Sequence, residues 1–311
     1  MSLPAPLHVI FGAGQVGASL ARLLQSRGLR VRVVRRSDTP IGPGVQVVAG
    51  NAMDPAFARS ATEGAAVIYH CMNPSTYTGE VWEREFPAQG EALIAAAMAA
   101  GARLVCLDNL YGYGITEDRR TESSAMGAEG RKGRVRVAWA ARLAAAERQG
   151  LRFSVGRAGD FFGPGSGAGA LMGAGMVAGV AKGDRAWLIG AADSPHAFSY
   201  VPDVVAGLAA LGGAGDDVEG QVFHLPILEV APAELVRRFG AAAGRPGRST
   251  ALPGWMVRVL GLVVPLFREL TETLYQWDRP FLVDDGRFRA RFPGLATALD
   301  AAVVDAVSAA R

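Results

Sequence analysis

Cysteine and histidine are scarce in this chain of 311 residues, and their scarcity excludes several classes of protein. The two cysteines, Cys71 and Cys106, lie in or beside apolar runs and predict reduced, buried thiols rather than a disulfide framework. The two cysteines and four histidines have no ligand spacing, so we expect no bound metal. We expect His70 and His196 to be hydrogen-bonded structural residues and not catalytic bases.

An excess of charge of one sign is missing too. The 32 lysines and arginines against 29 aspartates and glutamates leave a net charge of +3, and the basic residues are scattered along the chain. This distribution predicts binding neither to nucleic acid nor to a membrane. Residues 161–181 are too rich in glycine for a membrane helix, and Trp255 to Phe267 is interrupted by Arg258 and Pro265. With no basic and apolar leader at its start, the chain is expected to be cytoplasmic.

The most informative segment stands near the start of the chain. An apolar run at residues 7–11 leads into Gly12-Ala13-Gly14-Gln15-Val16-Gly17, a helical pattern at 18–27 and a second strand-like run at 29–34. A strand, a glycine turn and a helix in this order are typical of dinucleotide binding. We expect the N–H groups of this turn, including those of Gln15 and Val16, to hold a pyrophosphate at the positive end of the helix dipole.

Each glycine of the motif has a separate predicted task. Gly12 permits the sharp turn, Gly14 lets the backbone approach the pyrophosphate, and Gly17 lets the helix pack on the strand. The alternative is a glycine turn of an α/β fold that binds no ligand.

The end of the second strand-like run predicts which dinucleotide binds. An enzyme that prefers NAD usually has Asp or Glu there, whereas this chain has Arg35-Arg36-Ser37. Two guanidinium groups and a hydroxyl suit the 2′-phosphate, so we predict NADP(H). The alternative is that Arg35 and Arg36 are ordinary solvated surface charges.

Two further strand ends are expected to reach the cofactor. Ala52, Met53 and Asp54 follow the apolar run at 45–48, and Asp54 is equally suited to cap a helix that starts at Pro55. Cys71 and Met72 end the run at 66–72, which we expect to lie over the pyrophosphate.

Strands and helices continue to alternate along the first half of the chain. This rhythm predicts an α/β fold with a Rossmann-like, doubly wound parallel sheet and a smaller substrate-side lobe at the C-terminal end. We expect a dinucleotide-binding core at residues 1–160 and mainly the lobe at 161–311, with a segment at about 185–228 returning to the core sheet. The glycine-rich segment 163–169 is expected to form no regular element. The other predicted elements are helices at 81–100 and 135–149 and strands at 103–107, 152–157 and 221–225.

With these segments in order, the chain resembles the extended short-chain dehydrogenase/reductase superfamily, its NAD(P)-dependent epimerase/dehydratase group, and more narrowly the atypical members. The resemblance implies a cofactor-binding fold and hydride-transfer chemistry. It spans most of the chain and rests on five segments: Gly12-Ala13-Gly14-Gln15-Val16-Gly17, Gly50-Asn51-Ala52-Met53-Asp54, Asp108-Asn109-Leu110-Tyr111-Gly112-Tyr113-Gly114, Arg157-Ala158-Gly159-Asp160-Phe161-Phe162-Gly163-Pro164-Gly165, and Phe198-Ser199-Tyr200-Val201-Pro202-Asp203-Val204-Val205-Ala206.

The Tyr-x-x-x-Lys pair of that group is absent from its expected place. Counting back from Ala144-Ala145-Ala146-Glu147, which resembles the end of the group's catalytic helix, Trp139 replaces the tyrosine and Leu143 the lysine. Neither side chain can transfer a proton, and Arg142, one residue away, stays protonated near neutral pH. The group's serine position holds Asn109, which can donate a hydrogen bond but cannot relay a proton.

Other residues can be proposed as a replacement. Tyr111 and Tyr113 follow a strand end, and Lys132 stands in the segment after them. We expect Tyr111 or Tyr113 to act with Lys132, while Asn109 polarises a carbonyl oxygen. The alternative is that the tyrosines pack at the strand end and the lysine is solvated.

The sequence therefore favours an NADP(H)-binding oxidoreductase that transfers hydride to or from a small carbonyl or alcohol. The alternative is a catalytically silent NADP(H)-binding regulatory or redox-sensing protein, which the missing Tyr-x-x-x-Lys pair favours. The expected partner is a small-molecule substrate, and by analogy with the group the alanine-rich helices at 81–100 and 135–149 would permit a homodimer.

Overall fold

A computed structural model describes residues 5–167 and 169–311. The chain divides into two compact units, which we describe separately. The first unit contains the chain up to Asp108, Val135–Arg157 and Val205–Phe223, and the second contains Asn109–Arg134, Ala158–Val204 and His224–Arg311. The division differs from the single boundary expected at residue 160, because segments that follow strand ends join the second unit before the chain returns to the sheet.

The first unit is built on a seven-stranded sheet with the order β10-β6-β5-β4-β1-β2-β3. The neighbours from β3 to β6 pair in parallel. This order reverses direction between β1 and β4, which is where dinucleotides bind in doubly wound folds. The Rossmann-like sheet expected from the sequence is confirmed. Its strands are β1 (Leu7–Phe11), β2 (Arg30–Arg35), β3 (Val45–Ala49), β4 (Ala65–His70), β5 (Arg103–Asp108), β6 (Phe153–Arg157) and β10 (Gln221–His224).

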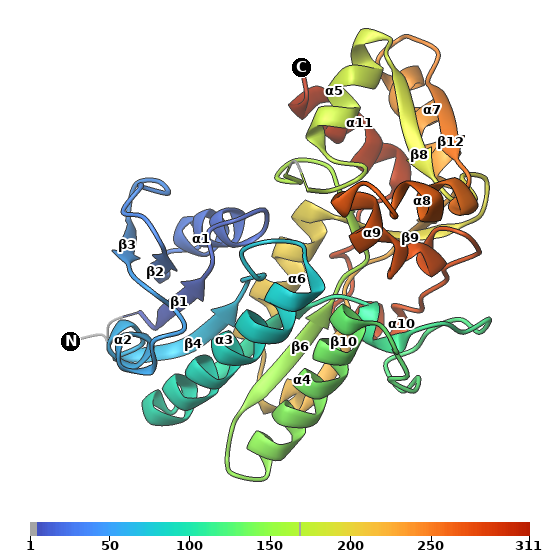
Figure 1. The fold of residues 1–311 in the computed structure, drawn as a ribbon. Coiled ribbons are helices and arrows are strands. Elements are labelled where there is room, and N and C mark those ends of the chain that lie inside the picture. Colours follow the sequence, from blue (N-terminus) through green and yellow to red (C-terminus); the bar gives the residue numbers. More distant parts are fainter. Residues whose placement is uncertain (1–4, 168) are drawn as a thin grey trace. The chain divides into compact units, whose positions relative to one another are not determined.

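Helices connect these strands, and Figure 1 shows α3 and α4 in front of the sheet. The start of α2 confirms the expected cap: Asp54 accepts from the backbone N–H groups of Ala56 and Phe57, and Pro55 is the first helical residue. At its other end α3 stops at Gly101, which has φ +61° in the left-handed region. The helices are α1 (Gly17–Ser26), α2 (Pro55–Ala61), α3 (Gly79–Ala100), α4 (Arg131–Glu147) and α6 (Val201–Gly213).

The second unit has two small sheets, with the strand orders β11-β9-β7 and β12-β8. Aromatic side chains such as Phe162, Phe198, Phe239 and Trp277 fill its core. The segment 163–169 belongs to no helix or strand as far as its residues are described. The elements are β7 (Asp160–Phe162), β8 (Arg185–Ile189), β9 (His196–Tyr200), β11 (Leu228–Val230), β12 (Arg248–Leu252), α5 (Ala174–Lys182), α7 (Pro232–Ala242), α8 (Gly254–Leu260), α9 (Pro265–Thr271), α10 (Gly286–Arg291) and α11 (Leu299–Ala309), with short 3₁₀ turns at Tyr111–Tyr113, Asp216–Val218 and Leu274–Gln276.

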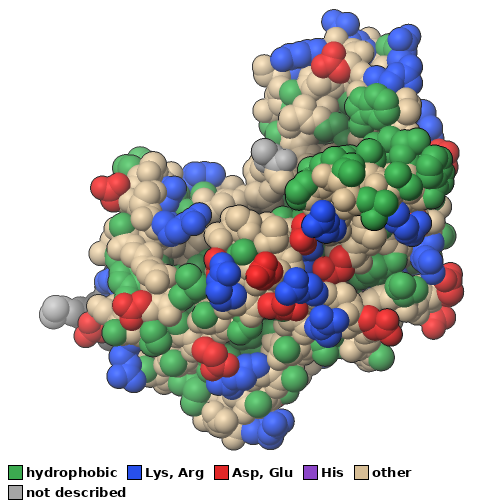
Figure 2. Space-filling view, viewed as in Figure 1, with side chains coloured by type: hydrophobic (Ala, Val, Ile, Leu, Met, Phe, Trp, Pro, Cys, Tyr) green, Lys and Arg blue, Asp and Glu red, His purple; other side chains and the backbone are tan. Residues whose placement is uncertain are grey.

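Two of these helices expose an apolar surface. Figure 2 shows hydrophobic side chains gathered over α8 and α9, where Trp255, Leu262, Val263 and Leu266 are exposed. No helix of the described part of the chain is long and apolar enough to cross a membrane.

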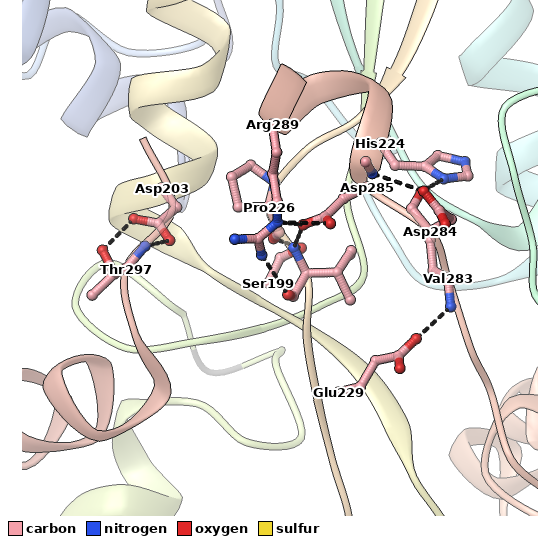
Figure 3. A network of polar contacts seen from close by, with 12 residues as sticks. Ser199, Asp203, His224, Pro226, Glu229, Val283, Asp284, Asp285, Arg289 and Thr297 are labelled. Atoms are coloured by element: carbon pink, nitrogen blue, oxygen red, sulfur yellow. Dashed lines mark hydrogen bonds and ion pairs between the residues drawn. The ribbon is translucent and has the colours of Figure 1, made fainter. Parts of the chain in front are cut away.

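A polar network holds the last part of the chain to the second unit (Figure 3). Asp203 accepts from the backbone N–H and the hydroxyl of Thr297 at 2.8 and 2.6 Å. Asp285 accepts from Arg289 Nε at 2.8 Å and from the backbone N–H of Ile227 at 2.8 Å. Burial raises the pKa of Asp203, and the Thr297 hydrogen bonds oppose that shift. Asp203, part of one of the five segments in the resemblance, therefore serves the structure.

Candidate functional site

The glycine turn at the end of β1 is closed around its own backbone. Gly12 has φ +98°, and a Cβ built there would lie 2.8 Å from the carbonyl oxygen of Cys71. A Cβ on Gly17 would lie 1.9 Å from the carbonyl oxygen of Gly12. Both positions require glycine for the reason given from the sequence: one for the turn, the other for close approach of helix and strand.

Gly14 differs from its two partners because space is open beside it. A Cβ at this position would meet no atom within 4 Å. The N-cap residue of α1, Val16, has no side-chain cap, so the helix start offers backbone donors to a ligand. The open space and these donors fit a dinucleotide pyrophosphate.

Cys71 and Met72 lie beside this turn, as their place at the end of β4 predicted. The N–H of Cys71 donates to the carbonyl oxygen of Phe11 at 2.9 Å, and Met72 Cγ is 3.0 Å from the Cβ position of Gly12. Burial raises the pKa of the Cys71 thiol to about 12, so this cysteine is not a thiolate nucleophile near neutral pH. Both cysteines are free.

At the end of β2 two cationic side chains and a hydroxyl are accessible. Arg35 is half-buried and donates to the carbonyl oxygen of Thr39 at 3.1 Å, whereas Arg36 and Ser37 are exposed. The N–H of Gly50 donates to the carbonyl oxygen of Arg35 at 2.9 Å, which places the segment with Ala52 and Met53 next to the strand end. The carboxylate of Asp54 is used to cap α2.

A buried ionic cluster lies at the carboxyl edge of the sheet, and sequence analysis missed it. Asp108, the last residue of β5, has Oδ1 3.1 Å from Arg136 Nη1 and Oδ2 3.2 Å from Arg157 Nε. Arg136 also donates to Asn73 Oδ1 at 3.1 Å and lies over the ring of Phe86 at 4.0 Å. All three charged side chains are at most 5 % exposed. The available signal was a charge at the end of each of two apolar strands.

The positions of the missing Tyr-x-x-x-Lys pair are structural. Trp139 is buried against His70, Phe86 and Gly90, and Leu143 is buried too. Arg142 lies on the surface, where its Nε and Nη2 are 2.5 and 2.8 Å from the carboxylate of Glu91. On α4 the residue that reaches the carboxyl edge of the sheet is Arg136 instead.

His70 ends β4 in an aromatic environment. Its ring stacks on Phe86 at 5.4 Å, and its Nδ1 accepts from the N–H of Met72 at 3.3 Å. Burial, and next the charge of Arg136, lower the pKa of His70 to about 3. The imidazole is neutral near pH 7, which agrees with the structural role expected for it. His196 in the second unit is held by Asp160 and the carbonyl oxygen of Gln276 at 2.7 and 3.0 Å.

The catalytic candidates of the second unit differ in their surroundings. Asn109 Oδ1 accepts from the N–H of Tyr111 at 3.1 Å. Tyr113 is buried, and its hydroxyl lies 2.6 Å from His224 Nε2. Lys132 is fully buried, and its ammonium contacts the carboxylates of Glu269 and Glu272. The structure thus binds Tyr113 and Lys132 to different partners rather than to each other.

Tyr111 lines a cavity of about 210 Å³ within the second unit. Glu272, Thr273 and Tyr275 contribute polar atoms to its wall, and the Tyr275 hydroxyl donates to the carbonyl oxygen of Tyr111 at 3.3 Å. No lysine or arginine lines it. The remaining wall residues are small or apolar apart from one further glutamate: Gly114, Ile115, Gly127, Ala128, Glu129, Gly130 and Gly133.

Comparison with known proteins agrees with this architecture. Residues 6–106 match the model of the NmrA-like family. No curated protein sequence matches the chain. Similar solved structures cover nearly the whole chain at low identity, and they confirm the fold of the extended short-chain dehydrogenase/reductase superfamily that the sequence resembles.

Three of these structures illustrate the likeness. A provisionally assigned epimerase from Burkholderia cenocepacia J2315 has TM-score 0.79 and 18% identity, covering 100% of this chain and 99% of its own. DesIV, the dTDP-glucose 4,6-dehydratase from Streptomyces venezuelae with NAD and TYD bound, has TM-score 0.77 and 19% identity, covering 97% and 96%. UDP-glucuronic acid 4-epimerase from Bacillus cereus in complex with NAD has TM-score 0.77 and 10% identity, covering 98% of both chains.

Proposed function

We propose that this protein is an NADP(H)-dependent oxidoreductase that transfers hydride to or from a small carbonyl or alcohol. The observation that carries the proposal is the glycine turn at the switch point of the sheet, where Gly14 leaves open space beside an uncapped helix start. Two of the structural neighbours described above contain NAD, which supports a nicotinamide dinucleotide as the ligand.

The choice of NADP over NAD rests on the end of β2. Arg36 and Ser37 are exposed there and Arg35 is half-buried, so a 2′-phosphate would find two guanidinium groups and a hydroxyl. The Arg35→Asp/Arg36→Ala variant should bind NADP⁺ at least about 10-fold more weakly in calorimetry and NAD⁺ no more weakly than before. Arg148→Ala, in an exposed arginine after the end of α4, is the control. Unchanged NADP⁺ affinity in the double variant would refute this assignment.

The cavity beside Tyr111 favours a small substrate. At about 210 Å³ it is below the usual range for a drug-sized ligand, and its wall has two glutamates but no lysine or arginine. A nucleotide-sugar diphosphate carries charges that such a wall would repel. A compact carbonyl compound without a phosphate fits its volume and charge better.

Tyr111 is the candidate for the proton donor in this proposal. Its ring lines the cavity, whereas the hydroxyl of Tyr113 lies against His224 and the ammonium of Lys132 contacts two carboxylates. The cofactor, when bound, supplies or accepts the hydride. Asn109 and Tyr111 would polarise the substrate oxygen, and the cavity wall would limit substrate size.

Steady-state oxidation of NADPH with a panel of aldehydes, ketones and quinones tests this assignment. Tyr111→Phe should lower kcat about 100-fold or more while NADPH affinity is unchanged. Tyr113→Phe should keep kcat within about threefold and lower the thermal midpoint instead, because its loss leaves buried His224 with one partner fewer. Equal losses of kcat in both variants would contradict the role given to Tyr111.

The second candidate function is a cofactor-binding regulator without turnover. It is favoured by the burial of Trp139 and Leu143, the positions at which the catalytic pair was expected. Tight NADPH binding with no oxidation across the whole panel would support the regulator and exclude the oxidoreductase.

A further inference from the structure

The α8–α9 hairpin of the second unit carries an exposed apolar patch, which we define as Trp255, Val259, Leu262, Val263 and Leu266. Figure 2 shows these helices covered by hydrophobic side chains. Leu262 and Val263 are 78 % and 76 % exposed, although such side chains are usually buried. A contiguous exposed patch of this kind commonly marks a site of interaction with a protein or a membrane.

The hairpin is folded so that few of its apolar side chains face inward. Val257 is buried in the core of the second unit and Phe267 packs against that core. Leu262 and Val263 lie in the turn between the helices and point away from the core, as their exposure shows. The most apolar part of the patch is therefore a protruding tip rather than a flat face.

Basic residues surround this tip without acidic residues in the same stretch of chain. Residues 245–268 contain Arg245, Arg248, Arg258 and Arg268 and no aspartate or glutamate. Of these, Arg258 has an acidic partner, Asp278, at 2.8 Å. The whole chain has a net charge of only +3, so this stretch holds a large share of the cationic excess.

Paired strands place further positive charge beside the hairpin. In the β8–β12 pair Arg185 stands opposite Arg248, and β12 leads through Leu252 and Pro253 directly into α8. Both arginines are exposed. Along the sequence the basic residues look scattered, but the fold collects several of them next to the apolar patch.

We propose that the α8–α9 hairpin docks on an anionic phospholipid surface. Leu262 and Val263 enter the acyl region, Trp255 lies at headgroup level, and Arg248, Arg258 and Arg268 contact the phosphates. Attachment is peripheral, because the two helices have seven residues each and lie in the interface. A bilayer suits a protruding apolar tip with a basic rim better than a second copy does, since like-charged rims would repel each other.

Flotation of the full chain with vesicles tests the proposal. We expect binding to vesicles of equimolar phosphatidylcholine and phosphatidylglycerol, weakened at least about 10-fold when the anionic lipid is left out or salt is raised. The Leu262→Ser/Val263→Ser variant should lose at least about 10-fold in partitioning. The matched control is Met98→Ser/Val304→Ser, which removes two exposed apolar side chains elsewhere.

Tryptophan emission reports the depth of docking. Trp82, Trp139 and Trp277 are buried, so in a Trp187→Phe background Trp255 is the exposed reporter. Its emission should shift to shorter wavelength with anionic vesicles and be quenched by brominated acyl chains.

Three results would overturn the proposal. They are absence of binding to anionic vesicles, equal binding by the patch and control variants, and a concentration-dependent dimer in sedimentation velocity that only the patch variant abolishes. The last result would assign the patch to a second copy of the chain. None of these measurements depends on cofactor binding or turnover, so the outcome is separate from that of the proposed oxidoreductase activity.

Discussion

Asp108 and Arg157 stand opposite each other on neighbouring strands of the sheet, and Arg157 Nε lies 3.2 Å from Asp108 Oδ2. Arg136 approaches the other carboxylate oxygen from α4. One buried carboxylate thus serves two buried guanidinium groups at the edge where a dinucleotide would lie. Because the carboxylate is shared, its removal leaves both cations without that counter-charge.

Asp108→Asn should therefore lower the free energy of unfolding by about 3–5 kcal/mol, measured by urea denaturation. Glu91→Gln is the control, because it breaks the exposed pair with Arg142 and should cost less than about 1 kcal/mol. Similar losses in both variants would show that the buried cluster does not contribute more than a surface ion pair.

Acid should destabilise the protein partly through His70. Its pKa lies below the ordinary value near 6.5, at about 3, so at intermediate pH the unfolded chain binds a proton that the folded chain does not. The free energy of unfolding falls as pH decreases through this window, by up to about 1.4 kcal/mol per pH unit for this group. His70→Phe should flatten the slope of urea stability between about pH 6 and pH 4. An unchanged slope would contradict the lowered pKa; His8, whose pKa burial also lowers, to about 4, is retained in both proteins.

Gly14 and Gly17 should separate cofactor binding from folding. Gly14→Ala fills open space and should leave the urea midpoint nearly unchanged while weakening NADP⁺ binding at least about 10-fold. Gly17→Ala pushes a methyl group onto the carbonyl oxygen of Gly12 and should cost about 2 kcal/mol or more of stability. Calorimetry and urea unfolding of both variants check this. Normal NADP⁺ affinity in Gly14→Ala would exclude the turn as the pyrophosphate site.

Gly90 tests the burial of Trp139. A Cβ at Gly90 would lie 2.4 Å from Trp139 Cζ3, so Gly90→Ala should cost about 1–3 kcal/mol in spite of alanine's higher helix propensity. Gly175→Ala in α5 meets no atom within 4 Å and should be neutral or stabilising by up to about 1 kcal/mol. Thermal unfolding of the two variants gives the comparison, and a stabilised Gly90→Ala would show that the tryptophan ring lies elsewhere.

The elements of the first unit could be predicted from the sequence because each is determined locally. Leu7–Phe11 is a strand with the predicted bounds, and the predicted helix at 81–100 begins at Gly79 and ends at Ala100. Apolar runs, glycine stops and the Asp54 cap are all signals within a few residues of the element they define.

The polar clusters could not be predicted in this way, because their members are far apart in the chain. Asp108 and Arg157 are 49 positions apart, and Lys132 and Glu272 are 140. Lys132 was expected to act beside a tyrosine, but nothing near it in the sequence indicates that two glutamates hold its ammonium. The apolar patch was missed for the opposite reason, since an exposed and a buried apolar run look alike in sequence.

The interleaving of the two units has a consequence for synthesis. On the ribosome β6 appears at residues 153–157, but its neighbour β10 emerges only at 221–224, after much of the second unit. Until then the nascent sheet has an unpaired strand at this border, where another chain could add. A fragment that stops at residue 160 would keep that exposed border permanently, so it should aggregate where the intact polypeptide does not.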